Sequence, residues 1–257
     1  MRTLRAQSKE LQMKITVANE CVYSKIKETF LPIIDQAIKA YLESIQNNNI
    51  INIRLMGSVP RGDAREIHSD IDFVAICKYK LSTDEKSRIQ QFEVLLSSKN
   101  KQVRKVDLEF ETIGDIYPAR EFVFITDSIS LYGKDLYKKP NYEIEAKQLA
   151  KNNTPNLEKL LINYRGGIHT VKTNDEIIQF SRWIGKDILK ALRYRLIVEK
   201  NIYEKTAIGI HFELCKNYPE DKDIFDSLLD VYLYPTNDVE KLNSILDNVE
   251  VIKEIYK

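Results

Sequence analysis

Two aspartates that follow a short glycine-containing segment are the residues whose types and spacing point to chemistry. Asp70 and Asp72 are two positions apart, at the start of a segment, residues 71–76, that is rich in β-branched and aromatic residues and predicts a strand. Side chains two apart on a strand project from the same face, and paired carboxylates repel each other unless a cation joins them. Because Mg²⁺ takes carboxylate and phosphate oxygens together, the pair indicates metal-assisted chemistry on a phosphate compound.

A predicted turn upstream of the aspartates has the features of a phosphate-binding backbone. Gly57 and Ser58 follow a predicted strand at residues 51–56, and Pro60 suits the first turn of a helix with Ser58 as its N-cap. Glycine lets a ligand approach the backbone closely, and N–H groups at such a turn favour phosphate oxygens. Most turns of this kind are structural, so the carboxylates are what make this one a candidate site.

A third carboxylate is expected from the strand predicted at residues 104–111. This strand alternates strictly between apolar and polar residues, and its polar face carries Asp107 and Glu109. Either one can serve as the third acidic group, with Asp107 as the first choice. Three carboxylates beside a phosphate-binding turn indicate a two-metal phosphoryl-transfer site.

The combined pattern GSVPRG, SDIDF and VDLEF, within residues 50–112, resembles the signature of the DNA polymerase β-like nucleotidyltransferases. The resemblance implies an α+β domain with a mixed β-sheet flanked by helices, two Mg²⁺ ions and a nucleoside triphosphate donor. It also implies a role for each matching residue: the triphosphate is held by Gly57 and Ser58, the metals by Asp70, Asp72 and Asp107, and Asp107 or Glu109 assists deprotonation of the acceptor hydroxyl. Arg61 either contacts phosphate or forms a salt bridge within the motif.

The elements that must position these residues divide the chain into two halves. Helices are predicted at residues 20–47 and from a capping box at Ser82 and Glu85 to residue 97. From residue 120 onward the spacing predicts only helices, at 173–200, 205–217, 221–233 and 238–256, the first opened by a capping box at Thr173. The polar stretch at 151–156 suggests a boundary. We therefore expect a nucleotidyltransferase domain at 1–150 and an all-α bundle at 151–257.

The helical half is more loosely similar to bacterial aminoglycoside nucleotidyltransferases, through residues 131–136 and 186–207. This resemblance implies transfer of AMP from ATP to a hydroxyl of an aminoglycoside antibiotic, with release of pyrophosphate. It implies that Lys205 contacts the ATP phosphates, with Arg193 as the second candidate for the same contact. The alternative is a solvated lysine and an arginine on a helix surface.

Two features of the helical half bear on the acceptor. Residues 210–257 contain eleven acidic residues and five lysines, a net charge of −6 that attracts a polycation and repels nucleic acid. Trp183 and Asp187 lie one turn apart on a predicted helix and could form an aromatic-plus-anion pair for an amino sugar. Alternatively, Trp183 belongs to the core.

The composition excludes several other classes of protein. The 257 residues carry 39 basic and 38 acidic side chains, without the basic excess of a nucleic-acid binder. The longest apolar stretches are far shorter than the roughly 18 residues of a membrane span, and the first 20 residues lack the apolar region of a secretory signal. We therefore expect a cytoplasmic protein with a small-molecule partner. The same chemistry on a lincosamide, a protein or RNA is the alternative, as is a non-catalytic module of a toxin–antitoxin pair.

The cysteines and histidines are not assigned to a metal at this stage. The cysteines lie far apart without a C-x-x-C pair, which favours reduced structural thiols over a disulfide framework or zinc site. The histidines also lack an evident ligand spacing. These residues are Cys21, Cys77, Cys215, His68, His169 and His211.

Overall fold

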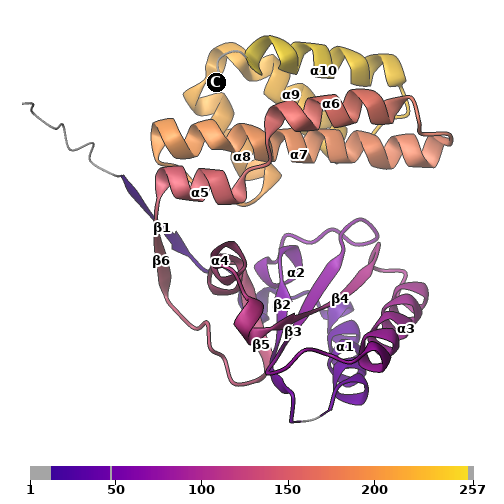
Figure 1. Cartoon of the computed structure of the whole chain (residues 1–257). Coiled ribbons are helices and arrows are strands. Elements are labelled where there is room, and N and C mark those ends of the chain that lie inside the picture. Colours follow the sequence, from indigo (N-terminus) through magenta and orange to yellow (C-terminus); the bar gives the residue numbers. More distant parts are fainter. Residues whose placement is uncertain (1–12, 47, 254–257) are drawn as a thin grey trace, which may run out of the picture. The chain divides into compact units, whose positions relative to one another are not determined.

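The computed structural model describes residues 13–46 and 48–253, and its contacts divide the chain into two units (Figure 1). The sheet unit comprises residues 16–142, and the helical unit comprises residues 143–253 together with 13–15. The expected boundary at residue 150 falls inside helix α5 (Ala146–Asn153), which belongs to the helical unit. The first 12 residues, which hold much of the segment considered above for a signal, lie outside the described part.

A four-stranded mixed sheet forms the centre of the sheet unit, as predicted. Its strands are β2 (Ile50–Met56), β3 (Ile71–Cys77), β4 (Val106–Thr112) and β5 (Ser128–Gly133), in the order β4-β3-β2-β5. Strand β2 is antiparallel to both β3 and β5, whereas β3 and β4 are parallel. A parallel pair needs a long crossover, and helix α3 (Thr83–Lys99) supplies it.

The two faces of this sheet have different coverings, and the difference exposes the candidate site. Helices α1 (Leu31–Ser44) and α3 pack on one face, where they bury alternate strand residues that include Leu55, Phe73 and Leu108. On the other face, Phe124 of helix α4 (Pro118–Thr126) packs against Met56, Val74 and Ile76. Because side chains alternate along a strand, the aspartates of β3 and β4 lie on this second face.

The structure corrects two sequence expectations about helices. The helix expected from residue 20 begins at Leu31, after short 3₁₀ turns at Tyr23–Lys25 and Glu28–Phe30, with a proline in its first turn. The expectation of helices only after residue 120 is wrong, because β5 and β6 (Asn141–Glu145) follow, the latter paired with β1 (Lys14–Ala18). The serines of β5 face polar partners on β2, so the strand lacks the apolar enrichment that would signal it.

The helical unit is built around one long helix, α7 (Asn174–Lys200), which begins at the predicted capping box. Its buried stripe packs with residues from the other helices into one apolar core. Two further 3₁₀ turns lie at Ile113–Asp115, in the sheet unit, and Pro219–Asp221, in the helical unit. Among the described helices, none has the length and apolar character needed to cross a membrane. The remaining helices are α6 (Leu157–Ile168), α8 (Ala207–Asn217), α9 (Lys222–Leu233) and α10 (Val239–Lys253).

Candidate active site

Three aspartates lie at one end of the β3–β4 pair. Asp72 and Asp107 are partners in the parallel register, and Asp70 comes two residues before Asp72, immediately ahead of β3. Neighbouring strands lie about 4.8 Å apart, so the side chains of Asp72 and Asp107 project side by side. The three acidic residues predicted from the sequence at a metal site therefore occupy the same end of this strand pair, each of them partly buried.

The glycine-serine turn lies directly against this group. Strand β2 ends at Met56, the register partner of Asp72, and Gly57 follows with φ 76° and ψ −140°, a conformation that favours glycine. A Cβ on Gly57 would lie 3.3 Å from Asp72 Oδ2. Glycine at position 57 therefore permits the positive φ of the turn and also leaves space for the Asp72 carboxylate. Gly57, rather than Ser58, is the N-cap of α2 (Ser58–Arg61), because Ser58 is already helical and Gly57 is the non-helical residue before it.

Two basic side chains that precede β4 partner the carboxylates. Arg104 Nη2 donates to Asp70 Oδ2, and Lys105 Nζ donates to Asp107 Oδ1. The hydrogen bond to Asp107 raises the pKa of Lys105 above its usual value. The sequence pattern does not indicate either cation, because their proximity to the aspartates depends on how β3 and β4 pair.

The chemistry of this group fits a divalent cation. Asp70 Oδ1 is buried and accepts no hydrogen bond within the described residues. Buried carboxylate oxygens almost always have a partner, and a hard cation such as Mg²⁺ binds oxygens of this kind. The residues that could hold such an ion are Asp70, just ahead of β3, and Asp72 and Asp107, which are register partners on β3 and β4.

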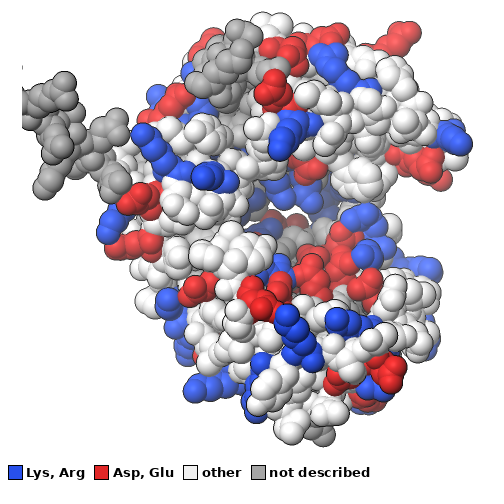
Figure 2. Space-filling model, viewed as in Figure 1, with Lys and Arg blue, Asp and Glu red and all other residues white. Residues whose placement is uncertain are grey.

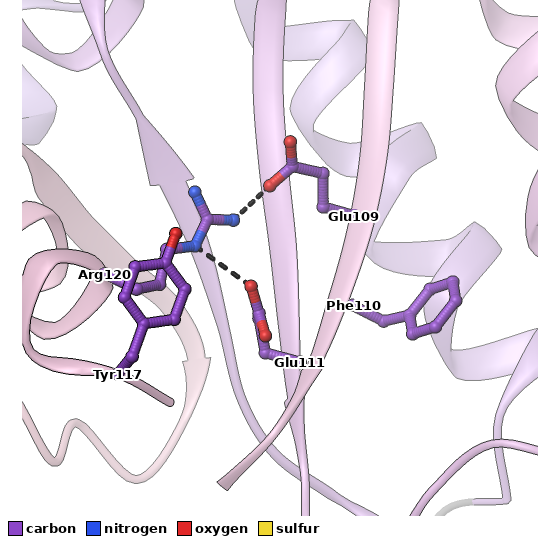
Figure 3. A pocket seen from close by; sticks show the side chains of 5 residues that line it. All are labelled: Glu109, Phe110, Glu111, Tyr117 and Arg120. Carbon is purple, nitrogen blue, oxygen red and sulfur yellow. Dashed lines mark hydrogen bonds and ion pairs between the residues drawn. The ribbon is translucent and has the colours of Figure 1, made fainter. Parts of the chain in front are cut away.

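Glu109 projects from the same face of β4 but has a different environment. Its register partner is Val74, and its carboxylate accepts a hydrogen bond from Arg120 of α4. Arg120 Nε also lies 3.2 Å from Glu111 Oε1, as Figure 3 shows. These side chains, with Phe110 and Tyr117, line an open pocket of about 420 Å³.

Arg61 forms salt bridges inside the sheet unit. Its Nη1 lies 2.5 Å from Asp127 Oδ1 and its Nη2 lies 3.3 Å from Asp63 Oδ2. Asp127 also accepts a hydrogen bond from the backbone N–H of Gly57, through its carbonyl oxygen, at 3.0 Å. Of the two contacts expected for Arg61, the structure therefore contains the salt bridge. This salt bridge ties the end of α2 to Asp127, whose carbonyl oxygen binds the backbone of the glycine turn.

Arg54 is a buried residue that sequence reasoning missed. Its guanidinium donates to Asp135 Oδ1 at 2.6 Å, to Ser128 Oγ at 2.8 Å and to the carbonyl of Phe124 at 3.0 Å. It is 1% exposed. Because these three acceptors come from the segment after residue 120, Arg54 ties α4, β5 and the residues after β5 to β2, a role that no local spacing indicates.

Arg193 and Lys205, proposed above as ATP contacts, belong to the helical unit. Arg193 is buried and donates to the carbonyl of Glu204 at 2.8 Å and to the carbonyl of Asn153, with its guanidinium 4.7 Å from the centre of the Tyr203 ring. These contacts join α5, α7 and the segment before α8. Arg193 is therefore not the surface arginine of the alternative interpretation, and Lys205 lies partly buried in that same segment.

Trp183 and Asp187 lie one turn apart on α7, as predicted. Trp183 is 40% exposed and does not belong to the core, which removes the alternative interpretation of this residue. Asp187 Oδ2 accepts a hydrogen bond of 2.6 Å from the Tyr164 hydroxyl. Burial and the nearby Asp187 carboxylate raise the pKa of Tyr164, so this hydroxyl stays protonated as a donor.

The acidic segment at the end of the chain is partly neutralised by other residues of the helical unit. Asp247 pairs with Arg165 at 2.7 Å, and Asp221 lies 3.8 Å from Arg195, and both arginines lie outside the segment. On the sheet unit, Figure 2 shows acidic side chains gathered with basic ones around them. The attraction of a polycation to residues 210–257 is accordingly weaker than the net charge of −6 in the sequence suggests.

The mixed sheet, with its glycine-serine turn and in-register aspartates, followed by a helical unit, has the fold of a nucleotidyltransferase. Among solved structures, the chain is similar to a crystal structure of spectinomycin adenyltransferase AAD(9) from Enterococcus faecialis with ATP and spectinomycin. The match has a TM-score of 0.53 and covers 85% of this chain and 98% of that one, at 11% sequence identity. At this identity the similarity concerns the fold. Neither protein-family models nor curated protein sequences match the chain.

Proposed function

We propose that this protein is a Mg²⁺-dependent nucleotidyltransferase that moves AMP from ATP to a hydroxyl of a small molecule, most directly an aminoglycoside antibiotic. The observation that carries the proposal is the pairing of Asp72 with Asp107 on adjacent strands, with the turn at Gly57 against Asp72 and with Asp70 two residues before it. The fold shared with an enzyme crystallised with ATP and spectinomycin supports both the donor and the class of acceptor.

In this proposal each residue of the site has a separate task. The backbone at Gly57 and Ser58 holds the triphosphate, and Asp70, Asp72 and Asp107 hold the two Mg²⁺ ions. When bound, these ions neutralise charge on the triphosphate and lower the pKa of the acceptor hydroxyl. Arg61 acts indirectly, since its salt bridge to Asp127 keeps the turn in place.

The reaction proposed for this site is an in-line displacement at the α-phosphorus. The acceptor hydroxyl loses its proton to the Asp107 carboxylate, and its oxygen forms a bond to the α-phosphorus. The bond from that phosphorus to the bridging oxygen breaks, and pyrophosphate leaves with the electron pair. No covalent intermediate on the protein is required, in keeping with a site made of carboxylates and backbone rather than of nucleophilic side chains.

Selection of the acceptor is assigned in this proposal to the helical unit. Trp183 offers an exposed aromatic face and Asp187 an anionic group one turn away, which suits a cationic amino sugar. Lys205 is retained as a candidate contact to the ATP phosphates. Arg193 contributes to the fold of the same segment through its carbonyl contacts.

A panel of acceptors tests the proposal. The purified chain is incubated with Mg²⁺, ATP labelled at the α-phosphate and, separately, spectinomycin, streptomycin, other aminoglycosides and lincosamides. Mass spectrometry should detect an aminoglycoside carrying one added AMP, together with released pyrophosphate. Modification of a lincosamide alone would move the acceptor to the alternative class, and the absence of any nucleotidylated compound would remove the proposal.

A pair of variants assigns the chemistry to the site. Asp72→Asn keeps the side-chain volume but weakens cation binding, so turnover should fall at least about 10³-fold, a loss typical of removing a group that stabilises transition-state charge. The matched control is Asp115→Asn, whose side chain is 57% exposed and lies outside the carboxylate group. Full activity in Asp72→Asn, with an unchanged fold by circular dichroism, would contradict the site assignment.

A further inference from the structure

Three potential metal ligands converge on one point between two helices of the helical unit. His211 and Cys215 are one turn apart on α8, and Asp226 lies on the neighbouring helix α9. His211 Nε2 lies 2.8 Å from Asp226 Oδ1 and 3.4 Å from Cys215 Sγ, and Sγ lies 3.9 Å from the same Asp226 oxygen. None of these residues is assigned to a metal from the sequence, although the i, i+4 spacing of His211 and Cys215 is a usable signal.

Hydrogen bonds within the trio can form without a metal, because a protonated His211 Nε2 and the Cys215 thiol can each donate to Asp226 Oδ1. All three groups nevertheless direct one potential ligand atom at a common point. With Nε2 and the thiol deprotonated, a cation at that point would take all three lone pairs at once.

The spacing of the three atoms fits a tetrahedral ion. With bonds of about 2.0–2.3 Å to nitrogen, oxygen and sulfur, tetrahedral Zn²⁺ holds its ligand atoms about 3.3–3.7 Å apart. The observed separations of 2.8, 3.4 and 3.9 Å bracket this range, so shifts of a few tenths of an ångström in partly buried side chains would complete the set. The fourth position would be taken by water.

We propose that His211, Cys215 and Asp226 form a site for a thiophilic divalent metal ion, Zn²⁺ in particular, that fastens α8 to α9. The thiolate, imidazole and carboxylate combination favours Zn²⁺ over Mg²⁺, which prefers oxygen ligands. Lys222 Nζ donates to the other oxygen of Asp226, Oδ2. This contact leaves Asp226 Oδ1 directed at the metal position. Outer-shell partners commonly orient metal ligands in this way.

A cobalt titration of the full-length chain tests this proposal without reading activity. The protein is freed of metal with a chelator and titrated with Co²⁺, which takes Zn²⁺-type sites and gives a near-ultraviolet charge-transfer absorption when a thiolate binds it. One equivalent should produce this absorption, and one equivalent of Zn²⁺ should abolish it. Cys215→Ser should remove the absorption, and His211→Gln or Asp226→Asn should weaken Co²⁺ binding at least about 100-fold.

Matched controls separate this site from the rest of the chain. His169→Gln and Asp223→Asn remove an exposed histidine and an exposed aspartate outside the trio and should leave the titration unchanged. The Asp72→Asn variant should also bind one Co²⁺ with the thiolate absorption, which distinguishes failure here from failure of the proposed catalytic function. The proposal is overturned if no thiolate absorption forms, or if it forms equally in Cys215→Ser.

A measurement on the unaltered protein guards against variants that do not fold. Alkylation of Cys215 by iodoacetamide, followed by peptide mass spectrometry, should slow at least about tenfold when Zn²⁺ is present, because a bound thiolate is shielded. An excess of Mg²⁺ should give no protection. Equal alkylation rates with and without Zn²⁺ would contradict the metal site.

Discussion

The partners of Asp107 and Glu109 distinguish two carboxylates that share one face of β4. Asp107 stands beside Asp72, whereas Glu109 stands beside Val74 and pairs with Arg120. We predict that Asp107→Asn lowers kcat by about 10²–10⁴-fold, the usual contribution of a positioned general base, and that the equally isosteric Glu109→Gln lowers it less than about tenfold. Steady-state kinetics at saturating ATP measures both. The reverse ranking would make Glu109 the base.

Much of the candidate site could be predicted at this scale, and the reason is local. The spacing of Asp70 and Asp72, and the alternation that places Asp107 with Glu109, are properties of single strands. The preference for Asp107 over Glu109 depends on the register between β3 and β4, which a single strand does not encode. The cations Arg104 and Arg120 were missed for the same reason, since their contacts form only when separate segments meet.

At the scale of elements, the start of α3 depends on one glutamate. Glu85 accepts hydrogen bonds from the backbone N–H of Ser82 at 2.8 Å and of Gln46 at 3.1 Å. Burial alone would raise the pKa of Glu85, but these hydrogen bonds outweigh it and lower the pKa. The ionised form therefore stabilises the crossover helix between β3 and β4 and ties it to the end of α1.

The sign of this shift predicts a pH dependence. A lowered folded-state pKa contributes stability that is present above the unfolded value, about 4.3, and that is lost as pH falls through the folded value. Glu85→Gln should therefore destabilise the sheet unit by about 1 kcal/mol at pH 7, and the difference from the unaltered protein should shrink below about pH 4.3. Urea unfolding at several pH values measures this, with Asp84→Asn, an exposed neighbour, as the control. A difference independent of pH would contradict the ionised capping box.

The elements that could be predicted are those whose signals are local. Both capping boxes mark the true starts of α3 and α7, because side chain and backbone bond within one turn. Strand β5 was missed because Ser128 faces the buried guanidinium of Arg54. A polar residue opposite a buried charge weakens the apolar alternation that signals a strand. The order of the strands also depends on pairing rather than on the strands themselves.

At the scale of the molecule, the large hydrophobic clusters of the two units are separate within the described residues. The cluster of the sheet unit spans residues 26–108 and that of the helical unit spans residues 161–252, and no residue belongs to both. The division of the chain into two halves was predicted from composition and periodicity. The boundary between the halves was less predictable. The polar stretch at 151–156 resembles a linker, but its first three residues are the end of helix α5 and its last residue is the N-cap of α6.

Separate cores predict that damage to one unit stays within it. Leu55 in β2 and Leu228 in α9 are both fully buried, at 0% exposure, so replacing either by alanine should cost about 2–5 kcal/mol of local stability. The local unfolding that exposes backbone amides to exchange occurs in cooperative units of the structure. Native-state hydrogen exchange of Leu55→Ala should therefore accelerate at the backbone amides of β2 and β3 and leave α7 and α9 unchanged, while Leu228→Ala should do the opposite. If either variant accelerated exchange equally in both units, the two cores would unfold as one cooperative unit.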